Sequence, residues 1–150
     1  MEKEIYEITC KTAAVIAITE NETKIIEENK TYVIQKPVAK IIKESCEYYG
    51  SSVAVRLKGS KSMLGMCYKL PIIIESSNEI IFFPTSSPLN KNCSWISLNH
   101  IKNYKKISNN VIIEFTGNKK ETFPITYESL ENQMFRATKL LLILKKRKNI

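Results

Sequence analysis

Short apolar runs separated by polar turns recur along this chain and limit the folds that it can adopt. Three such runs occupy residues 5–18, 23–27 and 31–34, with polar turns at 20–22 and 28–30. Runs rich in isoleucine, valine and threonine and bounded by polar clusters are typical of β-strands. The N-terminal part of the chain therefore predicts a strand meander.

Strand-like runs return in the second half of the chain. They cover residues 67–74, 79–83, 104–107, 111–115 and 121–125. The polar stretch 76–78 joins the first two runs as a hairpin, and the stretch 116–118 marks a later turn. We expect these runs to pair mainly as antiparallel strands.

Helical spacing marks one segment in the middle of the chain and one at its end. Pro37 stands where a helix would begin, and apolar residues then recur three and four positions apart until Gly50. A last helix begins near Tyr127, and its apolar end at 140–144 precedes four basic residues at 145–148. This end is typical either of a helix that docks on a protein core or of an amphipathic helix that binds a membrane surface, and we favour the core interpretation.

A further helix is predicted directly after the first. Ser51 or Ser52 can cap its start, and Gly65 stands where it would stop. Gly59 lies inside it and costs about 1 kcal/mol relative to alanine, so the helix is expected to be short or to break near residue 59. Together the segments predict an α+β fold: a single domain over residues 1–150, built mainly of antiparallel strands with two central helices and a C-terminal helix.

The charge of the chain points to a negatively charged partner. Its 150 residues include 23 lysines and arginines against 15 acidic residues, which gives a net charge of +8. Residues 1–35 have a net charge of −3, and residues 36–150 a net charge of +11. Such a balance suits a nucleic acid or an anionic membrane surface. A solvated basic surface that only keeps the protein in solution is the plain alternative.

The residue types argue against an enzyme or a metal site. All acidic residues are glutamates, and His100 is the only histidine. Cys93 and His100 are a conceivable nucleophile and base, but no aspartate is present to orient the histidine, so a hydrogen-bonded structural histidine is preferred. Cys10, Cys46, Cys67 and Cys93 lack the paired spacing of zinc ligands. We therefore predict a protein that is not an enzyme and needs no metal ion or cofactor.

No segment resembles a targeting signal. The apolar runs of the chain are far shorter than the roughly 20 residues that span a membrane. We expect a cytoplasmic protein without a membrane partner, in which the cysteines stay reduced.

The basic charge is most concentrated in residues 51–69. This segment contains Arg56, Lys58, Lys61 and Lys69 and no acidic residue. Lysine and arginine release counterions from a polyanion, and the free amides at a helix N-terminus bind phosphate oxygens. The segment is a candidate polyanion site, and a solvated helix face is the alternative with the same pattern.

Five segments in the middle of the chain resemble the ComK family of competence transcription factors. They are Ser45-Cys-Glu-Tyr-Tyr-Gly-Ser-Ser52, Arg56-Leu-Lys-Gly-Ser-Lys61, Tyr68-Lys-Leu-Pro-Ile72, Phe82-Phe-Pro-Thr-Ser-Ser-Pro88 and Cys93-Ser-Trp-Ile-Ser97 with His100-Ile101. Their order and spacing are far more specific than any one of them. Weaker similarity extends to residues 129–133, so most of the chain is covered.

The resemblance implies a transcriptional activator that turns on DNA-uptake genes. Members of the family are expected to bind paired AT-rich boxes in double-stranded DNA, largely through the minor groove, as dimers that assemble into tetramers. The resemblance also implies contacts with RNA polymerase and with the adaptor of a Clp protease. A narrow AT-rich groove has an enhanced negative potential that favours arginine and lysine, which agrees with the basic segment.

Charge and position within the resembling segments predict the site. The expected DNA-binding residues are Arg56, Lys58, Lys61, Lys69, Ser51 and Ser52. Arg56 is expected to enter the minor groove, the three lysines to contact phosphates, and the two serines to anchor the DNA backbone at a helix start. Trp95, Phe82 and Phe83 are assigned to the core instead.

A function of another class stays open beside this one. It is a ComK-like regulatory interaction protein that binds a protein or an anionic membrane partner without activating transcription. Its support in the sequence is the C-terminal helix, which is both apolar and basic. Binding to DNA, compared with binding to anionic liposomes, separates the two functions.

Overall fold

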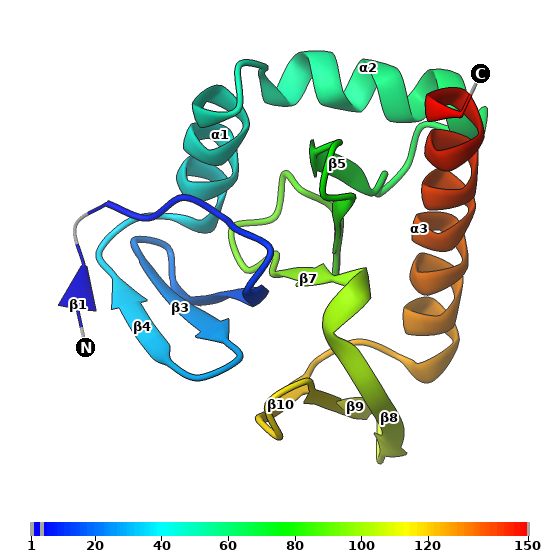
Figure 1. Cartoon of the computed structure of the whole chain (residues 1–150). Helices are drawn as coiled ribbons and strands as arrows, with labels where there is room; N and C mark the ends of the chain where they lie inside the picture. Colours follow the sequence, from blue (N-terminus) through cyan, green and yellow to red (C-terminus); the bar gives the residue numbers. More distant parts are fainter. Residues whose placement is uncertain (1, 4, 150) are drawn as a thin grey trace.

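A computed structural model describes residues 2–3 and 5–149 of the chain (Figure 1). Its strands are β1 (Glu2–Lys3), β2 (Thr12–Thr19), β3 (Glu22–Glu27), β4 (Thr31–Ile34), β5 (Ile72–Glu75), β6 (Ile80–Pro84), β7 (Trp95–Ser97), β8 (Ile101–Ile107), β9 (Asn110–Phe115) and β10 (Lys120–Phe123). Its helices are α1 (Val38–Tyr48), α2 (Val53–Leu64), α3 (Tyr127–Lys148) and the short 3-10 helix η1 (Leu98–His100). These elements confirm the predicted α+β class, with two central helices and a C-terminal one.

The strands form two sheets. The larger sheet has the order β1-β4-β3-β2-β7-β6-β5, and the smaller sheet the order β10-β9-β8. Neighbouring strands pair antiparallel except β1 and β4, which run parallel. The predicted meander is confirmed as β2, β3 and β4, and the predicted hairpin as β5 and β6.

The short strand β7 joins the two halves of the larger sheet. Trp95 pairs with Val15 of β2 on one side and with Pro84 of β6 on the other. The sequence does not predict this strand, because three residues show too little periodicity to be recognised. Trp95, Phe82 and Phe83 are all buried, as predicted.

The larger sheet is covered on both faces. Ile80 and Phe82 of β6 pack on one face with α1, whereas Ile81 and Phe83 pack on the other with α3 and the smaller sheet. This alternation is the two-residue period of a strand that is buried on both sides. α2 crosses the edge strand β5 and contacts both α1 and α3 (Figure 1). Leu57 of α2 accordingly packs against both cores.

The first predicted strand is too long. Residues 5–18 form a strand only from Thr12 onward, because a turn precedes it in which the Thr12 N–H donates to the Thr9 carbonyl oxygen (3.1 Å). The segment before the turn is tied to α1 and its end instead. There the Tyr49 hydroxyl donates to the Ile8 carbonyl oxygen (2.7 Å).

α2 is capped at both ends, as predicted. The Ser52 hydroxyl oxygen accepts a hydrogen bond from the Val55 N–H (3.1 Å). Gly65 follows the last turn with a left-handed φ of 70°, and its N–H donates to the Lys61 carbonyl oxygen (2.8 Å). The predicted break near Gly59 is wrong, since the helix runs through it. The two caps and the packing of the helix outweigh the cost of about 1 kcal/mol for an interior glycine.

Gly59→Ala is expected to raise the free energy of unfolding by about 0.5–1 kcal/mol. An added Cβ at Gly59 meets nothing within 4 Å, so the gain in helix propensity comes without a clash. Urea unfolding followed by circular dichroism measures the change. Gly65→Ala is the control, because its Cβ is equally free but its left-handed φ of 70° disfavours alanine. A stability loss in Gly59→Ala would contradict a regular helix at this position.

α3 packs along the core through one face. Leu130, Ala137, Leu140 and Leu144 are buried there. This confirms the prediction that the apolar end of the last helix docks on a protein core. Within residues 2–3 and 5–149, no helix combines the length and the hydropathy needed to cross a bilayer.

Candidate nucleic-acid interface

Three of the predicted site residues border one open hollow. This lysine hollow, as we name it, has a volume of about 420 Å³ and is lined by Leu57, Lys58, Lys61, Cys67, Lys69, Leu70 and Pro88. Lys58, Lys61 and Lys69 are exposed. No acidic residue is part of the described lining, and none of the three lysines forms an ion pair with a described residue.

The local fold brings these lysines together. Lys58 and Lys61 are three residues apart on α2 and therefore share one side of the helix. The chain then leaves the helix and turns back toward β5 (Figure 1). Lys69 has a left-handed φ of 48°, so the strand predicted over residues 67–74 starts only at Ile72. This irregular stretch holds Lys69 beside the two helix lysines.

Gln133 of α3 fixes the backbone of Lys69. Its side chain is only 3% exposed, and its amide nitrogen donates to the carbonyl oxygens of Lys69 (2.9 Å) and Pro84 (2.8 Å). Its amide oxygen accepts a hydrogen bond from the Arg136 guanidinium (3.0 Å). One buried amide thus ties the Lys69 loop to α3 and to the end of β6. A polar residue at a core-facing position of a helix is the sequence signal that points to such a role.

A second recess adjoins the lysine hollow. It has a volume of about 250 Å³ and is lined by Tyr68, Lys69, Thr85, Ile125, Ser129, Asn132, Gln133 and Arg136. Lys69 borders both openings, so Arg136 extends the same basic surface. Sequence reasoning misses Arg136, because no local pattern connects a residue of α3 with the loop after α2.

Arg56 occupies another side of α2. Arg56 and Lys58 are two residues apart, which corresponds to a rotation of about 200° around the helix axis. Arg56 is half-buried, and its Nε is buried without a hydrogen-bond partner among the described residues. Burial raises the pKa of the nearby Cys46 thiol to about 11, against the opposing effect of the Arg56 charge. Insertion of Arg56 into a DNA groove stays a prediction.

Ser51 and Ser52 lie at the start of α2, away from the hollow. Ser52 and Lys61 are nine residues apart, so the rise of the helix places them about 13 Å apart along its axis. The Ser52 hydroxyl oxygen is the helix cap, and the Ser51 N–H donates to the Cys46 carbonyl oxygen (3.0 Å). The structure therefore gathers the three predicted lysines, whereas the two serines lie at the start of α2 and Arg56 lies on another side of the helix.

Almost the whole chain matches a known protein family. The family model described as ComK protein matches residues 3–149. The chain belongs to the ComK family. It is also 35% identical over 115 residues to a protein named competence transcription factor from Bacillus subtilis (strain 168). That match covers 76% of this chain but 60% of the relative, which is less than two thirds of the relative's length. No solved structure matches the chain.

Two other basic surfaces of this ComK-family chain include acidic groups. Lys145 and Lys148 near the end of α3 lie 3.7 and 3.9 Å from the carboxylate of Glu79. A recess at β8 and β9 that contains Lys105 also contains Glu114. The described lining of the lysine hollow holds no such group, and this difference favours it as the polyanion site.

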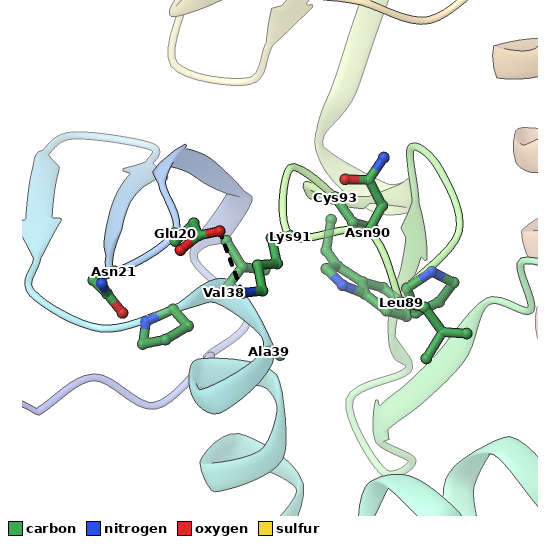
Figure 2. A pocket seen from close by; sticks show the side chains of 11 residues that line it. Glu20, Asn21, Val38, Ala39, Leu89, Asn90, Lys91 and Cys93 are labelled. Atoms are coloured by element: carbon green, nitrogen blue, oxygen red, sulfur yellow. Dashed lines mark ion pairs between the residues drawn. The ribbon is translucent and has the colours of Figure 1, made fainter.

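A hollow of about 310 Å³ adjoins the lysine hollow at Pro88, which lines both. It lies between the β2–β3 turn, the start of α1 and the loop between β6 and β7 (Figure 2). Glu20 and Lys91, on opposite sides of it, form an ion pair (3.3 Å). Because its lining includes an acidic residue, this hollow suits a polyanion less well.

Cys93 and His100 lie in separate hydrogen-bond networks. The Cys93 thiol donates to the Ser86 carbonyl oxygen (3.5 Å), and burial raises its pKa. His100 Nδ1 lies 2.8 Å from the Ser97 hydroxyl oxygen, and its Nε2 lies 3.5 Å from the Glu28 carboxylate. Burial lowers the pKa of His100 against the opposing effect of Glu28. His100 is thus buried and hydrogen-bonded, as the preferred interpretation expects.

Gln133→Leu is expected to lower the free energy of unfolding by about 1–3 kcal/mol, because the carbonyl oxygens of Lys69 and Pro84 lose their donor. Urea unfolding measures the loss. Asn132→Leu is the matched control, since Asn132 is exposed on the same helix and should change stability by less than about 0.5 kcal/mol. Equal stability of the two variants would show that the buried amide does not hold the loop.

Proposed function

We propose that this chain is a sequence-specific activator of competence genes that binds double-stranded DNA through the lysine hollow. The convergence of Lys58, Lys61 and Lys69 on a surface without acidic residues in its described lining carries the proposal. A capped helix and a fixed loop present these three cations to the phosphates of one duplex. The name of the Bacillus subtilis relative, competence transcription factor, supports the regulatory role.

The proposed target is a pair of AT-rich boxes that are contacted largely through the minor groove. An AT-rich groove is narrow and strongly negative, and its base edges carry a degenerate code. A protein therefore recognises it mainly by its charge and shape. In the proposed complex, Lys58 and Lys61 hold the phosphates of one strand and Lys69 those of the other. Arg136 extends this contact along the backbone.

Arg56, Ser51 and Ser52 are proposed as contacts farther along the same duplex. A helix of 12 residues is about 18 Å long, so a duplex that lies along α2 reaches its start as well as the hollow. The two serines then meet the backbone. Because Arg56 lies about 200° around the helix from Lys58, its proposed entry into the groove requires the duplex to extend around the start of α2. If the Arg56→Ala variant binds DNA as tightly as the wild type, Arg56 is not part of the interface.

The proposal extends to partners other than DNA. Paired boxes call for two copies of the chain related by a two-fold axis, as a dimer or within a tetramer. Activation calls for contact between the bound protein and RNA polymerase, and the adaptor of a Clp protease is proposed to deliver the protein for degradation. The proposed role is one of binding, without a catalytic step or a cofactor.

Fluorescence anisotropy with two labelled duplexes tests the function. One duplex carries two AT-rich boxes, and the other is GC-rich and of equal length. We expect binding to the AT-rich duplex to be tighter by at least about tenfold at physiological salt. A small molecule that fills the AT-rich minor groove should displace the protein. Equal binding to both duplexes would overturn sequence-specific recognition. Binding to anionic liposomes or to a protein, without any binding to DNA, would favour the interaction-protein function instead.

A further inference from the structure

The loop between β6 and β7 presents an aliphatic side chain to solvent beside the lysine hollow. Leu89 is 95% exposed, more than any other large hydrophobic residue in the described chain. The preceding residue, Pro88, is part of the lining of the hollow. An isolated exposed leucine needs no explanation by itself. Here, however, the leucine directly follows a residue of the lysine hollow, whose three lysines form no ion pair with a described residue, so we look for a partner that is both apolar and anionic.

Hydrogen bonds brace this loop at its base and near its tip. At its base the Thr85 N–H donates to the Ser94 carbonyl oxygen (2.9 Å), and the Ser94 N–H donates to the Thr85 hydroxyl oxygen (3.1 Å). Near its tip the Asn90 N–H donates to the Ser87 carbonyl oxygen (2.9 Å), and the Cys93 N–H donates to the Asn90 carbonyl oxygen (3.0 Å). A loop fixed in this way loses little conformational entropy when a partner covers its tip.

The Leu89 side chain points away from the acidic residue that lines the neighbouring hollow of about 310 Å³ (Figure 2). Figure 2 shows Glu20 and Asn21 on one side of that hollow and Leu89 on the other, with its side chain extending away from them. The Glu20 carboxylate is paired with Lys91 (3.3 Å), so its charge is offset. The apolar tip therefore points away from the paired Glu20 carboxylate (Figure 2), and the residue before it, Pro88, borders the lysine hollow.

From this arrangement we infer that Leu89 is a wedge that inserts between base pairs from the minor groove and kinks the duplex held by the lysine hollow. The inference rests on the proposed function. A minor groove offers in one place the two features that the surface matches: phosphates for Lys58, Lys61 and Lys69, and apolar faces of base pairs for Leu89. Unstacking is easiest at pyrimidine–purine steps, so the wedge favours a TA step within the bound site.

Energy transfer between dyes at the two ends of an AT-rich duplex tests the wedge. The duplex contains two AT-rich boxes and a TA step, and binding is titrated at several salt concentrations. Wild-type protein is expected to increase the transfer by bending the duplex. Leu89→Ala is expected to bind about tenfold more weakly, from the lost burial of the leucine, and to leave the duplex straighter. Its dependence on salt should equal that of the wild type, because no phosphate contact is lost.

Leu142→Ala is the matched control, because Leu142 is 57% exposed on α3 and lines neither of the two basic recesses. It should bind and bend DNA as the wild type does. If Leu89→Ala bends the duplex as strongly as the wild type, the wedge is wrong while DNA binding by the hollow stands. If the wild type fails to bind the duplex at all, the proposed function fails and the wedge with it.

Discussion

Gly117→Ala is expected to lower the free energy of unfolding by about 3 kcal/mol, because alanine is strained in the left-handed conformation and its Cβ overpacks a close contact. Gly117 has a φ of +88° in the turn between β9 and β10. A Cβ at this position would lie well under 3.0 Å from the carbonyl oxygen of Glu28, which belongs to the turn between β3 and β4. The obstacle is backbone, so it cannot rotate away as a flexible side chain would.

The contact at Gly117 sets the smaller sheet against the larger one. Around it, Lys24 pairs with Glu121 (2.9 Å), and Lys119 donates to the Thr31 hydroxyl oxygen (2.9 Å). An alanine that pushes the turn outward is therefore expected to weaken both of these polar contacts between the sheets. We therefore expect Gly117→Ala to lower the free energy of unfolding by more than the strain at the turn alone.

Gly50→Ala is the control for this substitution. Gly50 has a similar φ of +82°, but its added Cβ would meet nothing within 4 Å. Gly50→Ala should lower the free energy of unfolding only by the strain of the left-handed conformation, which is about 1–2 kcal/mol. Urea unfolding of the two variants isolates the effect of close packing. A loss in Gly117→Ala no larger than in Gly50→Ala would contradict the tight contact between the two sheets.

The triple substitution Lys58→Ala, Lys61→Ala and Lys69→Ala is expected to weaken binding to an AT-rich duplex by about a hundredfold, from roughly 1 kcal/mol for each lost phosphate contact. The slope of log K against log salt should fall by about three. All three lysines are exposed and unpaired within the described chain, so stability should change by less than about 0.5 kcal/mol. Salt-dependent fluorescence anisotropy measures the affinity and the slope together.

A second triple variant separates a local site from general charge. Lys102, Lys105 and Lys106 of β8 are exposed, and their replacement by alanine removes the same charge from another surface. We expect this control to keep most of its affinity and nearly the wild-type salt slope. Equal losses in the two triple variants would mean that net charge, rather than the lysine hollow, attracts the DNA.

Local patterns predict those parts of the fold in which neighbours in the sequence decide the structure. Ser52 and Gly65 mark the ends of α2 because capping depends only on the nearest turn. β7 escapes such reasoning, since its three residues are placed by β2 and β6 from distant parts of the chain. The break expected at Gly59 does not occur, because packing against α1, α3 and β5 overrides a propensity of about 1 kcal/mol.

The candidate site shows the same division. Lys58 and Lys61 are predictable as neighbours on one side of a helix. The position of Lys69 depends on its own left-handed backbone and on Gln133, and Arg136 joins the surface only through the packing of α3. Long-range packing of this kind has no signature in a single sequence.

Footprinting of lysines in the protein–DNA complex tests the central claim most directly. The protein is acetylated briefly with and without an AT-rich duplex, and mass spectrometry reports the reactivity of each lysine. If DNA lies in the lysine hollow, Lys58, Lys61 and Lys69 lose reactivity on binding, while Lys105 and Lys106 on β8 keep theirs. Protection of the β8 lysines, with the hollow left reactive, would contradict the account.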